Sequence, residues 1–128
     1  MSESVLREKS YAFAIRIVEM NRFLCSEKKE YVLSKQVLRS GTAIGALIHE
    51  AEFGQSTPDF RTKLTIALKE ANETQYWLRL LSDTNYIEIK AYESISGDCL
   101  ELVRMLVASI KTLKKKEELE KSLKKQKL

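Results

Sequence analysis

Few residues in this chain have side chains and spacing suited to catalysis. His49 is followed by Glu50, as in the zinc-protease motif His-Glu-x-x-His, but Phe53 occupies the position of the second histidine. His49 is the sole histidine, so one chain cannot supply two Glu-x-x-His ligand pairs on facing helices either. Cys25 and Cys99 form no Cys-x-x-Cys pair, and no Gly-x-Ser-x-Gly motif is present. We therefore expect no enzyme activity, no metal site and no cofactor.

Four charged residues form the next candidate cluster. Arg39 precedes a glycine-containing segment, and Lys69, Glu70 and Glu73 follow on a later predicted helix, with Lys69 and Glu73 one turn apart. The cluster could be an active or binding site, or it could form ion pairs within the bundle or between subunits. Because the planar guanidinium of arginine suits pairing with carboxylates, we favour the structural or subunit-contact interpretation.

Two glycines and two aromatic residues point to helix contacts. Gly41 and Gly45 lie in a predicted helix, where each costs about 1 kcal/mol relative to alanine. A phosphate-binding loop would need a turn between a strand and a helix, so we interpret both glycines as sites of close helix–helix approach. Tyr76 and Trp77 could stack on bases, but aromatic residues at helical spacing favour a core or subunit-contact interpretation.

Positive charge is concentrated at the C-terminus. The chain carries a net charge of +4, whereas residues 111–128 alone carry +5 from eight lysines and three glutamates, which leaves −1 on the rest. The nucleic-acid-binding candidates are Lys111, Lys114, Lys115, Lys116, Lys121, Lys124, Lys125 and Lys127. Phosphate binding by such a segment would depend on salt and be largely independent of base sequence. The alternative is that the lysines, interleaved with glutamates, only solvate the segment.

The elements that must position these residues are helices. Alanine, leucine, lysine and glutamate abound, whereas the chain has one proline and four glycines. Gly54 is typical of a helix end, and Ser56, Pro58 and Asp59 are typical of the start of the next helix. Apolar residues recur at three- and four-residue intervals. This pattern predicts helices over about 5–26, 30–53, 58–82 and from about 90 onward.

These segments predict an all-α fold, an up-down-up-down antiparallel four-helix bundle. We assign residues 1–113 to the bundle and 114–128 to a basic, lysine-rich helical extension. No apolar run approaches the ~20 residues that a membrane span needs, and the N-terminus lacks the apolar core of a signal peptide. We therefore expect a cytoplasmic protein with no membrane partner.

Two segments resemble a known protein family. Residues 38–51 read LRSGTAIGALIHEA, and residues 59–81 read DFRTKLTIALKEANETQYWLRLL. They are similar to the bacterial four-helix-bundle proteins encoded within intervening sequences of 23S rRNA genes, whose pattern includes RSGTSIGANIxEA and KLxIAxKEAxETxYWLxLL. The resemblance extends to FAIRIV at 13–18 and IKT at 110–112. Ala43 and Leu47 depart from the serine and asparagine that are frequent in the family.

The resemblance implies a four-helix bundle that assembles as a ring-shaped homopentamer, and it implies no established activity. A distant branch of similar bundles serves as accessory subunits of reverse transcriptases in retroelements. Our leading hypothesis is a non-enzymatic oligomer that binds RNA or another nucleic acid through clustered basic tails. The alternative is a scaffold or accessory subunit that binds a protein partner, for example a reverse transcriptase, without contacting nucleic acid. Salt-sensitive RNA binding would distinguish the two hypotheses.

Overall fold

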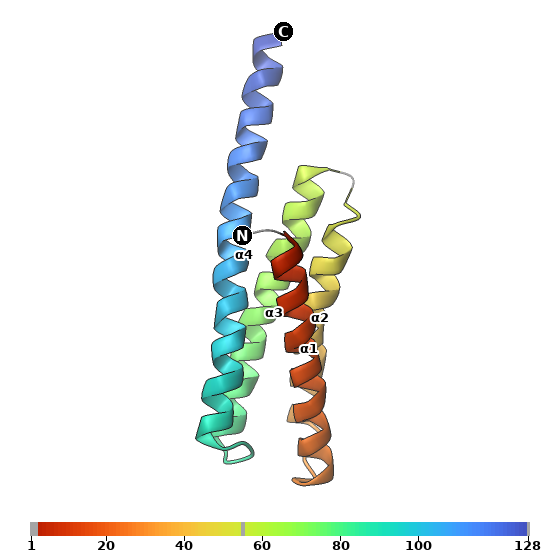
Figure 1. Cartoon of the computed structure of the whole chain (residues 1–128), viewed down its shortest axis with the longest axis vertical. Helices are drawn as coiled ribbons and strands as arrows, with labels where there is room; N and C mark the ends of the chain where they lie inside the picture. Colours follow the sequence, from red (N-terminus) through yellow and green to blue (C-terminus); the bar gives the residue numbers. More distant parts are fainter. Residues whose placement is uncertain (1–2, 55, 128) are drawn as a thin grey trace.

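Apolar side chains spaced three and four residues apart fold this chain into four α-helices. The structure, a computed structural model, describes residues 3–54 and 56–127. Its helices are α1 (Glu3–Ser26), α2 (Leu33–Ala51), α3 (Thr57–Asp83) and α4 (Ile89–Lys127). Successive helices run in opposite directions and lie side by side (Figure 1). The predicted all-α, up-down-up-down antiparallel four-helix bundle is therefore confirmed.

One face of each helix contributes to a shared apolar core. Burying this surface away from water is the main stabilising contribution to such a bundle. The largest fully buried apolar side chains are Phe13, Ile17, Leu24, Val37, Ile44, Leu64, Leu78, Leu81, Leu102 and Leu106. They come from all four helices, so no helix can leave the bundle without exposing core residues to water.

The contact between α1 and α4 is sparser than the other helix contacts and carries polar bridges. Lys9 Nζ lies 2.9 Å from Glu101 Oε1, and Arg16 Nη1 lies 2.6 Å from Asp98 Oδ2. Arg16 also donates a hydrogen bond to Ser94 Oγ at 3.0 Å. These exposed pairs align the first and last helices, while the buried apolar residues supply most of the stability.

The start of α2 differs from the sequence prediction, which placed Glu30 near the first residues of the helix. The helix begins at Leu33, and Lys29 adopts a left-handed backbone conformation with φ of 53°. Glu30 is only 7% exposed. Its carboxylate accepts hydrogen bonds from the backbone N–H groups of Val32 at 2.7 Å and Leu33 at 2.8 Å. Glu30 therefore caps the helix from outside it.

The start of α3 agrees with the sequence prediction. Ser56 Oγ accepts a hydrogen bond from the backbone N–H of Asp59 at 3.3 Å, and Pro58 lies in the first turn. Asp59 also places a negative charge at the positive end of the helix dipole. The helix continues to Asp83, within one residue of the predicted end.

Two glycines allow α1 and α2 to approach closely. A Cβ atom on Gly41 would lie 2.8 Å from Ile17 Cγ1, and one on Gly45 would lie 3.2 Å from the backbone oxygen of Ser10. Gly97 in α4 is different, because a Cβ atom there would meet nothing within 4 Å. Gly41 and Gly45 thus serve packing inside one bundle, whereas Gly97 faces open space.

The last helix extends well past the other three. α4 contains 39 residues, and its C-terminal part projects beyond the ends of α1, α2 and α3 (Figure 1). The lysine-rich segment predicted from residue 114 continues this helix without interruption. Within residues 3–54 and 56–127, none of the helices combines the length and apolarity required to cross a membrane.

Candidate nucleic-acid interface

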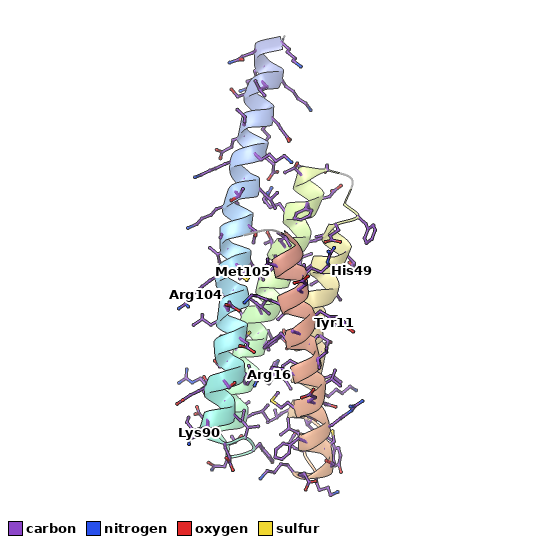
Figure 2. All side chains as sticks on the ribbon, in the orientation of Figure 1. Tyr11, Arg16, His49, Lys90, Arg104 and Met105 are labelled. Atoms are coloured by element: carbon purple, nitrogen blue, oxygen red, sulfur yellow. The ribbon has the colours of Figure 1, made fainter. Side chains whose placement is uncertain are left out.

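All eight predicted nucleic-acid-binding lysines lie exposed on the C-terminal half of α4. Side chains along this part of the helix point outward into solvent (Figure 2). In the part of the chain that the structure describes, no ion pair engages any of the eight ammonium groups. Their charges are therefore available to an external anion.

An ion pair to α3 anchors the base of the projecting segment. Arg61 Nη2 donates to Glu117 Oε1 at 3.1 Å, and Arg61 Nε donates to the other carboxylate oxygen. The hydrogen bonds from Arg61 lower the pKa of Glu117 below its usual value, and the charges of Lys121 and Lys114 lower it further. From residue 118 to 127 every side chain is exposed. The segment thus leaves the bundle at a fixed point.

The sequence prediction missed the pairing of Arg61 with Glu117. The two residues lie 56 positions apart, and nothing in the local spacing of either one indicates the other. The signal that could have indicated this pair is the position of Glu117 on its helix. Glu117 continues the core-facing row of Leu106, Ile110 and Leu113 at three- and four-residue steps. A carboxylate at this position faces the adjoining helix, so it indicates that a cation lies there.

The structure brings Arg39 together with two of the three charged residues predicted to accompany it. Arg39 Nη1 donates to Glu70 Oε2 at 2.8 Å, and Arg39 Nη2 contacts Glu73 Oε2. Glu73 also accepts a hydrogen bond from Trp77 Nε1 at 2.9 Å. The bonds from Trp77 and Arg39 lower the pKa of Glu73. Lys69 lies exposed outside this set.

The outer face of α2 and α3 around Arg39 combines polar and apolar exposure. The Arg39 side chain is 51% exposed. Tyr76 is 61% exposed and packs edge-to-face on Trp77, with ring centroids 5.0 Å apart. Ile66 is also exposed on the same helix. Tyr76 therefore does not belong to the core, and Trp77 is only partly buried against it.

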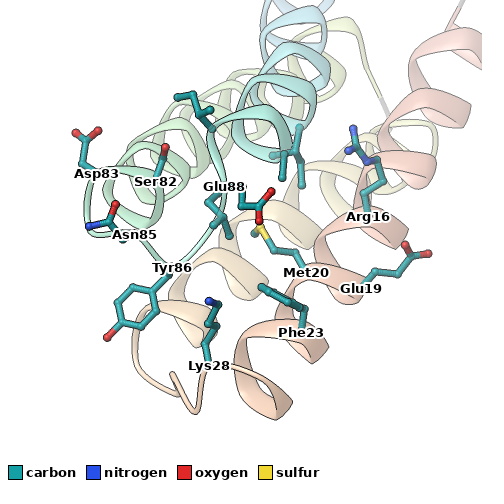
Figure 3. Close-up of a pocket in the computed structure, with 14 residues that line it drawn as sticks. Arg16, Glu19, Met20, Phe23, Lys28, Ser82, Asp83, Asn85, Tyr86 and Glu88 are labelled. Atoms are coloured by element: carbon teal, nitrogen blue, oxygen red, sulfur yellow. The ribbon is translucent and has the colours of Figure 1, made fainter.

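A groove lies where α1 meets the turn between α3 and α4. It has a volume of about 880 Å³. Met20, Ile87 and Ile95 are buried there, and Arg16 and Glu19 line the groove on the α1 side (Figure 3). Sequence analysis did not predict this groove, because it depends on how far α1 and α4 diverge near the turn.

The remaining candidates offer no catalytic arrangement among the described residues. His49 is exposed and contacts Phe53, with ring centroids 5.5 Å apart. Burial raises the pKa of the Cys99 thiol to about 12, with a smaller effect of Asp98, so the thiol stays protonated at neutral pH. Cys25 is half-buried near Ser34. Residues 3–54 and 56–127 contain no cluster of three or more potential metal ligands from histidine, cysteine, aspartate and glutamate.

These observations define a class of protein, namely an antiparallel four-helix bundle whose last helix ends in a lysine-bearing arm, residues 111–127, that continues past the contact of Glu117 with α3. Comparison with protein families gives a match to the 23S rRNA-intervening sequence proteins over residues 3–108. The chain therefore belongs to this family, as the motifs at 38–51 and 59–81 indicated. All eight lysines lie beyond the matched region.

A solved structure supports the same assignment. It is the crystal structure of a protein of unknown function from the S23 ribosomal protein family of Bacteroides thetaiotaomicron VPI-5482. That protein is 56% identical in sequence, and the match covers 87% of this chain and 99% of that chain with a TM-score of 0.85. No curated protein matches this chain at a significant level. The relatives therefore provide the fold and the family but no activity.

Proposed function

We propose that this protein is a non-enzymatic, cytoplasmic oligomer that binds RNA through the lysines of its projecting helix. The observation that carries the proposal is the exposure of eight lysines, none engaged in an ion pair among the described residues, on a helix that extends beyond the bundle. Phosphate groups are the natural ligands of such ammonium groups, and each contact releases counterions from the nucleic acid.

Self-association would strengthen this binding. The resemblance to the family implies a ring-shaped homopentamer. The outer face of α2 and α3 has features of a subunit contact and so supports self-association. Arginine and aromatic residues are enriched at protein interfaces, and this face presents Arg39, Tyr76 and the exposed Ile66. Several arms on one assembly would bind a single RNA with far higher avidity than one arm alone.

RNA binding is expected to disappear when the eight lysines are replaced together by glutamine in the full chain. Glutamine has a helix propensity close to that of lysine and a polar side chain only one bond shorter, but it carries no charge. Fluorescence anisotropy with a labelled structured RNA should show binding by the wild-type chain that falls by orders of magnitude between about 50 and 200 mM salt. Circular dichroism of the variant checks that its helices are intact.

Equal binding by the wild type and a folded eight-lysine variant would contradict the arm as the binding site. A lack of binding by the wild type at low salt would exclude the RNA proposal. The alternative would then be a protein-binding scaffold or accessory subunit, for which the apolar floor of the groove between α1 and the α3–α4 turn is the supporting observation.

Assembly is expected to break down in the Arg39→Ala variant. The substitution leaves Glu70 and Glu73 without their cation and removes the guanidinium from the proposed contact face. Light scattering after size exclusion should show a smaller mass than for the wild type. Arg104→Ala, which removes an exposed arginine from α4, is the matched control and should keep the wild-type mass. Unchanged mass and unchanged melting for Arg39→Ala would refute this role.

A further inference from the structure

The lysines of the arm are not evenly distributed around the helix. Successive residues of an α-helix are turned by about 100°, so Lys111, Lys114, Lys121 and Lys125 fall within an arc of about 80°. We call these four residues the lysine stripe. It extends along about 21 Å of the helix axis at 1.5 Å per residue. Glu118 lies within the same arc and reduces the net charge of the stripe to +3.

The other side chains of the arm lie outside this arc, with Lys115 next to its edge. Leu119 and Leu123, which are 61% and 48% exposed, lie roughly opposite the stripe. The other lysines of the arm point in scattered directions outside the arc: Lys115, Lys116, Lys124 and Lys127. The helix therefore has one face that carries four ammonium groups along its axis, with the carboxylate of Glu118 between Lys114 and Lys121.

The arm has no means of stacking on exposed bases. Proteins that bind single strands without sequence preference combine a basic groove with aromatic side chains on which bases stack. No phenylalanine, tyrosine, tryptophan or histidine follows Tyr92 in this sequence. A ligand of the arm is therefore recognised through its phosphates and their charge density.

Charge density and rigidity both favour a duplex as the ligand. A duplex carries one charge per about 1.7 Å of its axis, so a length of about 21 Å holds about 12 phosphates around its circumference, compared with about 6 on one strand, and its charge density is correspondingly higher. A flexible strand would also lose conformational entropy on aligning with a straight helix. We infer that the lysine stripe binds double-stranded nucleic acid in preference to single strands. This inference rests on the proposed function and specifies the ligand of the same site.

The test compares two probes on the full-length chain. Anisotropy titrations use a labelled RNA duplex of about 20 base pairs and one of its strands alone, at several salt concentrations. We expect the duplex to bind more tightly by on the order of tenfold at about 0.1 M salt. Four phosphate contacts per arm correspond to a slope of log affinity against log salt of about −3.6 for a duplex. A single strand that binds as tightly as the duplex would overturn the inference.

Two variants with the same charge change test the stripe itself. One replaces Lys111, Lys114, Lys121 and Lys125 by glutamine, and the other replaces Lys115, Lys116, Lys124 and Lys127 by glutamine. The first should lose on the order of tenfold more duplex affinity than the second and show a flatter salt dependence. Equal losses would overturn the stripe while leaving the proposed function intact. A wild-type chain that binds neither probe would overturn both.

Discussion

Replacing Gly45 by leucine is expected to lower the free energy of unfolding by about 3 kcal/mol. The residue faces the backbone of α1, where even a Cβ atom would lie 3.2 Å from the carbonyl oxygen of Ser10. Backbone cannot swing aside as a flexible side chain can, so a leucine forces α1 and α2 apart and opens the core around Phe13 and Ile44. Urea denaturation monitored by circular dichroism measures the change.

Gly97→Ala is the matched control for this prediction. A Cβ atom at Gly97 meets nothing within 4 Å, so alanine adds helix propensity without a clash and should raise the free energy of unfolding by about 1 kcal/mol. The two glycines are thus expected to respond with opposite signs. A Gly45→Leu variant with the wild-type unfolding midpoint would contradict the close contact between α1 and α2.

The helices of this protein are predictable because their signals are local. Apolar residues at three- and four-residue steps indicate which face is buried, and the sequence Ser56 to Asp59 indicates where α3 begins. The glycines at 41 and 45 were interpretable for the same reason, since a helix keeps glycine mainly where another element must come close. Each of these features is encoded within one or two turns of its own helix.

The contacts that position the candidate site are not local. Arg61 and Glu117 meet because α3 and α4 run in opposite directions and α4 is long enough to bring residue 117 back to the start of α3. Similarly, which carboxylates of α3 pair with Arg39 depends on the rotation of α3 about its axis, and in the structure these are Glu70 and Glu73. Periodicity gives the buried face of each helix, but the pairing of charges across helices depends on their relative rotation and shift.

The start of α2 was predicted about three residues too early for a related reason. The short polar segment Lys28-Lys29-Glu30 is typical of a solvated junction, and a glutamate at a helix start is usually read as part of the first turn. In the structure the positive φ of Lys29 turns the chain so that the Glu30 side chain folds back over the first N–H groups of α2. A backbone turn of this kind has no strong sequence signal unless glycine or asparagine occupies it.

Replacing Glu30 by alanine is therefore expected to destabilise the protein by about 2 kcal/mol. Alanine leaves the N–H groups of Val32 and Leu33 without their acceptor in a region where Glu30 itself is nearly inaccessible to solvent. Glu30→Gln retains one side-chain oxygen as an acceptor and should lose about half as much, because hydrogen bonds to a charged group are roughly twice as strong as neutral ones.

Thermal and urea unfolding of both variants against the wild type would measure these differences. An alanine variant as stable as the wild type would show that water replaces the carboxylate at no cost and would refute Glu30 as the cap. The order wild type, glutamine, alanine in decreasing stability is the signature of an acceptor whose charge and whose oxygen both contribute. Because the cap lies at the end of the bundle opposite the arm, its loss should leave the affinity per folded molecule for nucleic acid unchanged.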